Sequence, residues 1–169
     1  MKLIEALKKV KDLLRKADDI KEKISKHCSD LDCETPVYEN QKAVVSAWIQ
    51  AHSDLLKEVE MLQFRIMKTN ISTKMCGEID GNFIEKSIFE WMSRRKTLAE
   101  KELSCWKCLG DRGLREGAVN QSSGSVLMVK IRRYFDPEKR DQKIFVFSSE
   151  PSIIDGKLEI ANCVTDLLD

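Results

Sequence analysis

Two cysteines of this sequence form the motif Cys105-Trp106-Lys107-Cys108, which could carry thiol chemistry. A C-x-x-C pair supports redox catalysis when it opens a helix, because the N-terminus of the helix stabilises the reactive thiolate. Here the motif comes at the end of a helical pattern, where the helix dipole disfavours a negative charge. Its position therefore argues against a redox site.

Zinc binding is a second possibility for the cysteines. If the first two predicted helices form an antiparallel hairpin, the first and third helices run parallel and their C-terminal ends meet. Cys28 and Cys33 would then lie near Cys105 and Cys108, and four thiolates can hold a zinc ion tetrahedrally, with His27 as a spare ligand. Cysteines also serve as small core residues, which is the alternative interpretation. Apart from this zinc, no cofactor is expected.

The sequence identifies no other catalytic group. His52 lies within an apolar seam, so we expect a hydrogen-bonded core or interface histidine rather than a general base. Neither His27 nor His52 has a Glu three residues before it, which excludes the di-iron motif of ferritin-like bundles. A P-loop and a G-x-G-x-x-G motif are also absent from the sequence, so nucleotide-binding enzymes of those types are excluded.

Two stretches of the chain, RIMKTNISTKM and KLEIANCVTDL, are nearly alike. Each contains an Asn followed three residues later by a Thr, and the pairs are Asn70 with Thr73 and Asn162 with Thr165. Equivalent C-caps on two helices would explain the likeness, because Asn tolerates the left-handed conformation that ends many helices. The other interpretation is an internal repeat in which two helix ends present their Asn amides to a common ligand.

Apolar residues spaced alternately three and four apart predict long helices over residues 2–31, 39–70, 82–109 and 136–162. A seam with a repeat of about 3.5 residues needs a neighbouring helix to cover it. The clearest seam belongs to the second helix and comprises Trp48, His52, Leu55, Val59, Leu62 and Ile66.

The last third of the chain is less regular. A β-prone run predicts a short strand over residues 125–133. Residues 144–151 contain KIFVF, which is typical of a buried strand, and Pro151 opposes a helix. However, helical spacing continues through this segment, and Asp136 before a proline is a good helix start. We therefore predict a helix that is kinked at Pro151.

Composition limits the class of protein. The chain has 169 residues, the size of one domain, and its charged fraction of 34% suits long amphipathic helices. Lys and Arg number 29 against 28 Asp and Glu, which gives no electrostatic footprint for nucleic acid or an anionic membrane. We find neither a signal peptide nor a long apolar run, so we expect a cytoplasmic protein with reduced cysteines.

Four segments resemble, in order, the bacterial septicolysin-like proteins: MKLIEALKKVKDLLRK, LQFRIMKTNISTKM, SRRKTLAEKEL and DGKLEIANCVTDLLD. The resemblance covers nearly the whole chain, and its most specific parts are the two Asn-containing phrases. It implies a mostly helical protein of unknown function, and it favours a helix for the KIFVF stretch. Cys163 stands where the family usually has Trp, and Pro151 interrupts the last helix.

Together these patterns predict a single, mainly α domain, a bundle of long antiparallel helices with a small β element between the third and fourth helices. We expect a homo-oligomer held through the helix seams, with no nucleic-acid or membrane partner. The expected function is that of a non-enzymatic structural or protein-interaction protein of the bacterial cytoplasm. The alternative is a small-molecule or metal-binding protein with its site at Asn70 and Asn162 or at the cysteines.

Overall fold

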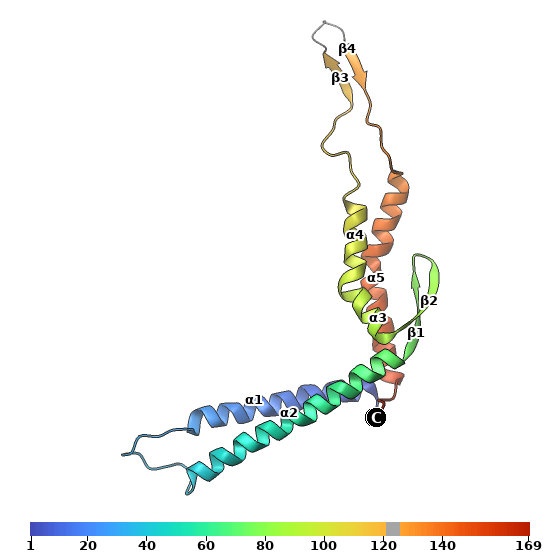
Figure 1. Cartoon of the computed structure of the whole chain (residues 1–169). Coiled ribbons are helices and arrows are strands. Elements are labelled where there is room, and N and C mark those ends of the chain that lie inside the picture. Colours follow the sequence, from blue (N-terminus) through green and yellow to red (C-terminus); the bar gives the residue numbers. More distant parts are fainter. Residues whose placement is uncertain (121–125) are drawn as a thin grey trace. The chain divides into compact units, whose positions relative to one another are not determined.

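The computed structural model of the chain describes residues 1–120 and 126–169. It divides into two compact units. The first unit contains Met1–Lys74, Ser87–Phe89 and Glu159–Asp169, and the second contains Met75–Lys86 and Glu90–Leu158. Helices make up most of the described chain (Figure 1). A mainly α protein is thus confirmed, whereas a single bundle of long helices is not.

The first unit is built on two antiparallel helices, α1 (Leu3–His27) and α2 (Gln41–Ser72), which lie side by side (Figure 1). Their facing sides are apolar, so pairing removes both stripes from water. The buried residues are Leu3, Ala6, Leu13 and Ala17 of α1 and Val59, Leu62 and Ile66 of α2. This confirms the predicted helical hairpin, although α1 ends four residues earlier than the predicted residue 31.

A β-hairpin occupies the place where the third helix was predicted to begin. Strand β1 (Lys74–Ile79) pairs with β2 (Asn82–Ser87) through a two-residue loop. The loop residues Asp80 and Gly81 both have positive φ angles, 52° and 79°, as a type I′ turn requires. The predicted helix start at residue 82 was therefore wrong, because the Asp-Gly turn fixes a hairpin there.

The β1–β2 hairpin packs against helices of the second unit. Trp91 is buried and its indole Nε1 donates a hydrogen bond to the Met75 carbonyl at 3.0 Å. Gly77 is also buried, and a Cβ atom placed on it would lie 2.2 Å from the Trp91 ring. At the turn, the ammonium of Lys143 contacts the carboxylate of Asp80. Glycine at residue 77 is thus the residue that lets the strand approach the indole.

The remainder of the predicted third helix is helical but contains one extra residue. It consists of α3 (Ile88–Ser93), the π-helix η1 (Arg94–Leu98) and α4 (Ala99–Lys107). The Ala99 amide donates to the Arg94 carbonyl, five residues back, which is the hydrogen bond of a π-turn. Ala99, the residue that follows the π-turn, is completely buried, as Trp91 of the same unit almost completely is.

A second β-hairpin follows α4. Strands β3 (Gly117–Asn120) and β4 (Val126–Val129) are antiparallel, with Gly117 opposite Val129 and Asn120 opposite Val126. The predicted strand over residues 125–133 is confirmed for β4, while Ser125 lies outside the described residues.

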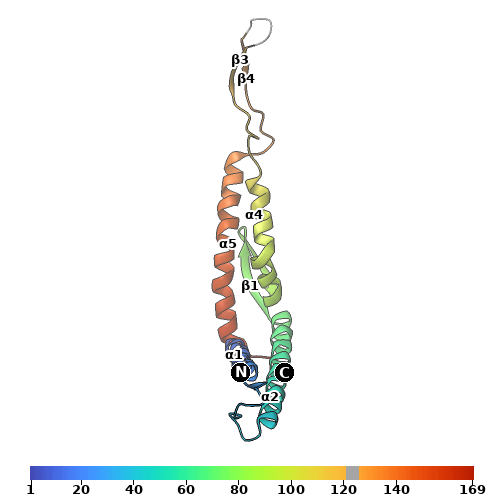
Figure 2. The same ribbon diagram turned by 90° about the vertical axis from the view of Figure 1, so that its left-hand side faces the viewer.

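The last element, α5 (Pro137–Val164), settles the ambiguity at residues 144–151 in favour of a helix. The Asp136 carboxylate accepts a hydrogen bond from the Glu138 amide at 2.9 Å and caps the helix as predicted. Pro151 lies inside the helix. α5 and α4 run side by side in both views (Figure 2), and Arg140 donates to the Leu109 carbonyl at 3.1 Å.

Candidate functional site

The four predicted ligand-binding residues lie in the first unit, near the ends of α2 and α5. Asn70 is buried and Asn162 is half-buried. Neither Asn ends its helix, because α2 continues to Ser72 and α5 to Val164. The prediction that both are left-handed C-caps is wrong: among the described non-glycine residues, only Asp80 and Arg112 have positive φ angles. The helices stop in extended backbone instead, as Thr73 does with φ −84° and ψ 124°.

Thr73 and Thr165 have the same hydrogen bonds at the two helix ends. The Thr73 amide donates to the Thr69 carbonyl, and the Thr165 amide donates to the Ala161 carbonyl, both at 2.9 Å. Each Thr carbonyl then accepts the amide of a residue that begins another helix. Ile88 of α3 donates to Thr73 at 3.0 Å, and Leu3 of α1 donates to Thr165 at 2.9 Å.

This helix-end junction, defined by Leu3, Thr73, Ile88 and Thr165, reveals an internal structural repeat. One half consists of α1 and α2, and the other consists of α3, η1, α4 and α5. Leu3 and Ile88, the first residues of the two halves, are both completely buried. Thr73 and Thr165 are also structurally equivalent, because the carbonyl at the end of each half accepts a hydrogen bond from the amide that begins the other half. The likeness of the two phrases therefore comes from the fold, and ligand binding by the Asn amides stays a prediction.

The repeat extends beyond the junction to an ion pair. Glu150 follows Glu58 by the same 92 residues that separate Asn162 from Asn70, and Arg94 and Lys9 each lie six residues after the start of their half. Lys9 Nζ contacts Glu58 Oε1 at 2.7 Å, and Arg94 Nη2 donates to Glu150 Oε2 at 3.0 Å. The two halves thus join their helices by equivalent cation–carboxylate pairs.

The two pairs differ sharply in burial. The side chains of Lys9 and Glu58 are half exposed, whereas Arg94 is 10% exposed and Glu150 only 3%. Two hydrogen bonds from Arg94 to Glu150 and a contact with Glu102 compensate the buried charge. The pKa of the Arg94 guanidinium is raised above its usual value, mainly by the hydrogen bonds with Glu150. Sequence reasoning missed this pair, although Glu58 and Glu150 stand at matching positions of the repeat.

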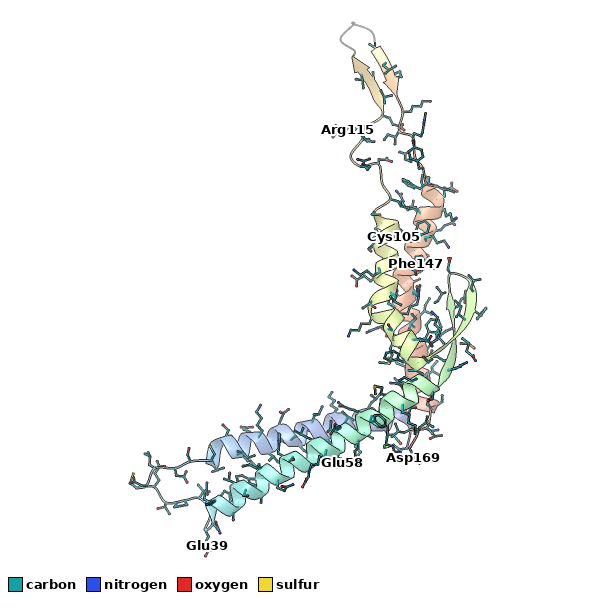
Figure 3. All side chains as sticks on the ribbon, in the orientation of Figure 1. Glu39, Glu58, Cys105, Arg115, Phe147 and Asp169 are labelled. Atoms are coloured by element: carbon teal, nitrogen blue, oxygen red, sulfur yellow. The ribbon has the colours of Figure 1, made fainter. Side chains whose placement is uncertain are left out.

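Thr69 connects the junction to the C-terminal residues. It is completely buried, and its hydroxyl donates to the Arg65 carbonyl at 2.8 Å and accepts the Leu168 amide at 3.0 Å. Arg65 Nε donates to the Leu168 carbonyl at 2.9 Å, and its guanidinium contacts Asp169, which lies against α2 (Figure 3). The last residues are thereby fixed to α2.

Thr69→Val should lower the free energy of unfolding by about 1 kcal/mol, because it removes the acceptor of the Leu168 amide from a partly buried hydrogen bond. Chemical denaturation measures this loss, and hydrogen exchange should show faster exchange of the Leu168 amide. Thr97→Val is the matched control: Thr97 makes the same back-bond, to Ser93 at 3.1 Å, but is exposed. Equal losses in both variants would contradict this role of Thr69.

The predicted zinc ligands are divided between the units. Cys28 and Cys33 belong to the first unit, and Cys105 and Cys108 belong to the second. All four are exposed, and the Cys108 thiol donates to the Cys105 carbonyl at 2.9 Å. Within residues 1–120 and 126–169, no group of three or more His, Cys, Asp or Glu side chains is arranged to hold a metal ion. His27 packs with Tyr38 and Trp48, at ring distances of 5.6 and 5.8 Å.

The seam predicted to hold an oligomer is largely used inside the chain. Val59, Leu62 and Ile66 are buried, and Trp48, His52 and Leu55 are half-buried. α1 is the neighbour of α2 and covers this face. A second copy would therefore have to bind elsewhere, so the assignment of these residues to an oligomer contact needs correction. The seam pattern shows that a helix face is covered but not which chain covers it.

Comparison with known proteins adds the fold alone. A crystal structure of a functionally unknown conserved protein from Corynebacterium diphtheriae is similar, with a TM-score of 0.60 over 99% of each chain and 18% identity. No family model matches the sequence, and no curated protein matches it. Among the described residues, no helix is both long and apolar enough to span a bilayer.

Proposed function

We propose that this chain is a non-enzymatic structural protein that acts by binding a second copy of itself through the outer face of α2. The observation that carries the proposal is that the C-terminal half of α2 has a stripe of exposed apolar side chains away from the face that packs on α1. An apolar stripe on a helix normally packs against a neighbouring element, and α1 covers only the inner face of α2. The resemblance to septicolysin-like proteins adds no reaction or ligand to this proposal.

The outer stripe of α2 is formed by exposed apolar side chains at spacings of three and four residues. Phe64 is 62% exposed. Phe64, Met67 and Ile71 lie on the side of α2 opposite to Val59, Leu62 and Ile66, which face α1, whereas Met61 lies at the edge of the stripe, beside Lys9 and Leu62. The members of the outer stripe are Met61, Phe64, Met67 and Ile71. Methionine and phenylalanine in this pattern are typical of helix contacts that adapt to a partner helix.

The charges beside the outer stripe favour a second copy of α2 as the partner. If two α2 helices pack antiparallel with Phe64 at the centre, Met61 faces Met67 of the partner subunit. Glu60 then faces Lys68 of the partner subunit, and symmetry repeats the pair on the other side. The central part of the surface, from Glu60 to Lys68, is thus self-complementary, as a two-fold contact requires.

Phe64→Asp should convert the dimer to a monomer, because it places a charge at the centre of the apolar contact. We expect the dissociation constant to rise at least about thirtyfold, which corresponds to a hot-spot loss of about 2 kcal/mol. Sedimentation velocity over a range of concentrations measures the change. Since Phe64 is exposed, the thermal unfolding midpoint of the monomer should stay near that of the wild type.

Phe83→Asp is the matched control, because Phe83 is 79% exposed but lies on β2, outside the outer stripe. It should leave the dimer unchanged. A dimer that tolerates Phe64→Asp, or that both variants weaken equally, would show that the outer stripe is not the contact.

A further inference from the structure

The connection between α1 and α2 is acidic and carries exposed apolar residues. Residues 29–40 contain Asp30, Asp32, Glu34 and Glu39 and no Lys or Arg. Leu31 lies between the first two carboxylates and is 65% exposed. A turn holds it, since the Leu31 amide donates to the Glu34 carboxylate at 3.1 Å and the Glu34 amide donates to the Leu31 carbonyl at 3.0 Å. We call Asp30, Leu31 and Asp32 the acidic knob.

The corresponding connection of the other half of the repeat has the opposite charge. Between Leu109 and Phe135 the sequence contains five basic and two acidic residues. A hollow of about 320 Å³ lies at the base of the β3–β4 hairpin. Its apolar lining includes Leu109, Leu114, Ile131, Tyr134 and Phe135. Arg112 and Arg132 also line this hollow, which we call the basic hollow, and both are exposed.

A neighbouring ion pair fixes the walls of the basic hollow. Arg133 donates two hydrogen bonds to the Asp111 carboxylate, each of 2.7 Å, and joins the segments before β3 and after β4. These bonds, with the charge of Arg133, lower the pKa of Asp111, so that carboxylate is ionised at neutral pH. This ion pair joins the two segments that line the hollow, and Arg112 and Arg132 are exposed beside it.

We propose that the acidic knob of one copy binds in the basic hollow of a second copy. Leu31 would enter the apolar lining, while Asp30 and Asp32 would pair with Arg112 and Arg132. This contact rests on the proposed function in one respect, which is that the partner is a second copy of this chain. It joins two different surfaces, so each copy offers one knob and one hollow, and contacts of this kind that do not close reciprocally between two copies extend the α2-paired dimers into larger assemblies.

A second copy explains the charges better than an anionic membrane does. The basic hollow presents two exposed cations beside an apolar lining, which matches one apolar side chain flanked by two carboxylates, whereas an anionic membrane surface offers these cations its headgroup charges alone. The acidic knob complements the hollow, because it places one apolar side chain between two negative charges. Arg112 and Arg132 offer planar groups that match carboxylates.

Charge reversal tests the contact in the full-length protein by sedimentation velocity at low salt. Asp30→Lys with Asp32→Lys makes both surfaces positive, and Arg112→Glu with Arg132→Glu makes both negative. Each double variant should lose assemblies larger than the dimer, with at least tenfold weaker association. Mixing the two double variants, or combining all four changes in one chain, should restore the large assemblies. Asp18→Lys with Asp19→Lys, on the exposed side of α1, is the control and should change nothing.

The outcomes separate this contact from the α2 contact. If the dimers assemble further to the same extent in every charge-reversal variant, or if they never assemble further, the knob-in-hollow contact is overturned. The α2 dimer is not affected by either outcome. A monomer under all conditions would overturn both. Binding of the wild type to vesicles of anionic phospholipid, abolished by Arg112→Glu with Arg132→Glu and without larger assemblies, would identify a membrane as the occupant instead.

Discussion

Glu150→Leu should lower the free energy of unfolding by about 3–5 kcal/mol, because it leaves the buried Arg94 guanidinium without its main partner. Glu102 still contacts Arg94, but its side chain is half exposed and cannot replace two buried hydrogen bonds. Urea denaturation of the variant and the wild type measures the difference. The effect is large because the Arg94 guanidinium is removed from water and has lost the carboxylate that mainly compensates its charge.

The internal repeat provides the control for this prediction. Glu58→Leu removes the equivalent carboxylate from a half-exposed pair, and we expect a loss of no more than about 1 kcal/mol. Arg94→Met combined with Glu150→Leu should recover most of the stability, because no charge then remains unpaired in the core. Similar losses for Glu58→Leu and Glu150→Leu would contradict the assigned difference in burial.

Gly77→Ala should destabilise the second unit by about 1–3 kcal/mol or more, because the new methyl group overlaps the ring of Trp91. Neither side can relax easily: the clash is with a rigid ring, and the hydrogen bond from Trp91 to Met75 holds that ring in place. The thermal unfolding midpoint and the near-ultraviolet circular dichroism of the indole should both change.

Gly110→Ala is the control for Gly77→Ala, since nothing lies within 4 Å of a Cβ at residue 110 and the φ angle of Gly110 is not positive. It should change stability by no more than about 0.5 kcal/mol. If Gly77→Ala were as neutral as Gly110→Ala, the close packing of β1 on Trp91 would be refuted.

The long helices could be predicted because their apolar spacing is set by the same period as their backbone. α1, α2 and α5 begin and end within a few residues of the expected positions, and Asp136 caps α5 as its sequence indicates. The helix at residues 144–151 was also predictable, since the spacing continues past Pro151. Long periodic segments average over local exceptions, whereas short elements depend on a few residues.

The β1–β2 hairpin was missed although its signal is present. Asp80-Gly81 is a strong signal for a hairpin turn. However, the apolar residues after it also fit a helical pattern, so the predicted helix included the residues of β2. The π-turn at Arg94 could not be predicted, because one inserted residue shifts the pattern only slightly. Arginine is mostly exposed in folded proteins, and only the fold shows that Arg94 is buried.

The likeness of two phrases predicted that the candidate residues lie near two equivalent helix ends, whereas ligand binding there stays a prediction. Asn70, Thr73, Asn162 and Thr165 do lie at equivalent helix ends, and the threonines rather than the asparagines make the capping bonds. The sequence could not show which helix starts those ends contact. That information comes from hydrogen bonds between residues as far apart as Leu3 and Thr165.

The repeat also gives a physical reason for two different contacts between copies. Its halves share the helix-end junction and the joining ion pair, but their connections have diverged into an acidic loop and a basic β-hairpin. A chain with opposite charges on corresponding connections can bind its own copies head to tail. In the proposed assembly, the outer stripe of α2 would supply a separate, two-fold contact.

Self-association is the central claim, and sedimentation velocity of the wild-type protein tests it most directly. Measured from submicromolar to high micromolar concentration, the protein should show species at multiples of 19.4 kDa whose proportion rises with concentration. At high salt the dimer should remain while larger species decline, because salt screens the charged contact but not the apolar one. A single species of 19.4 kDa at every concentration would contradict the account.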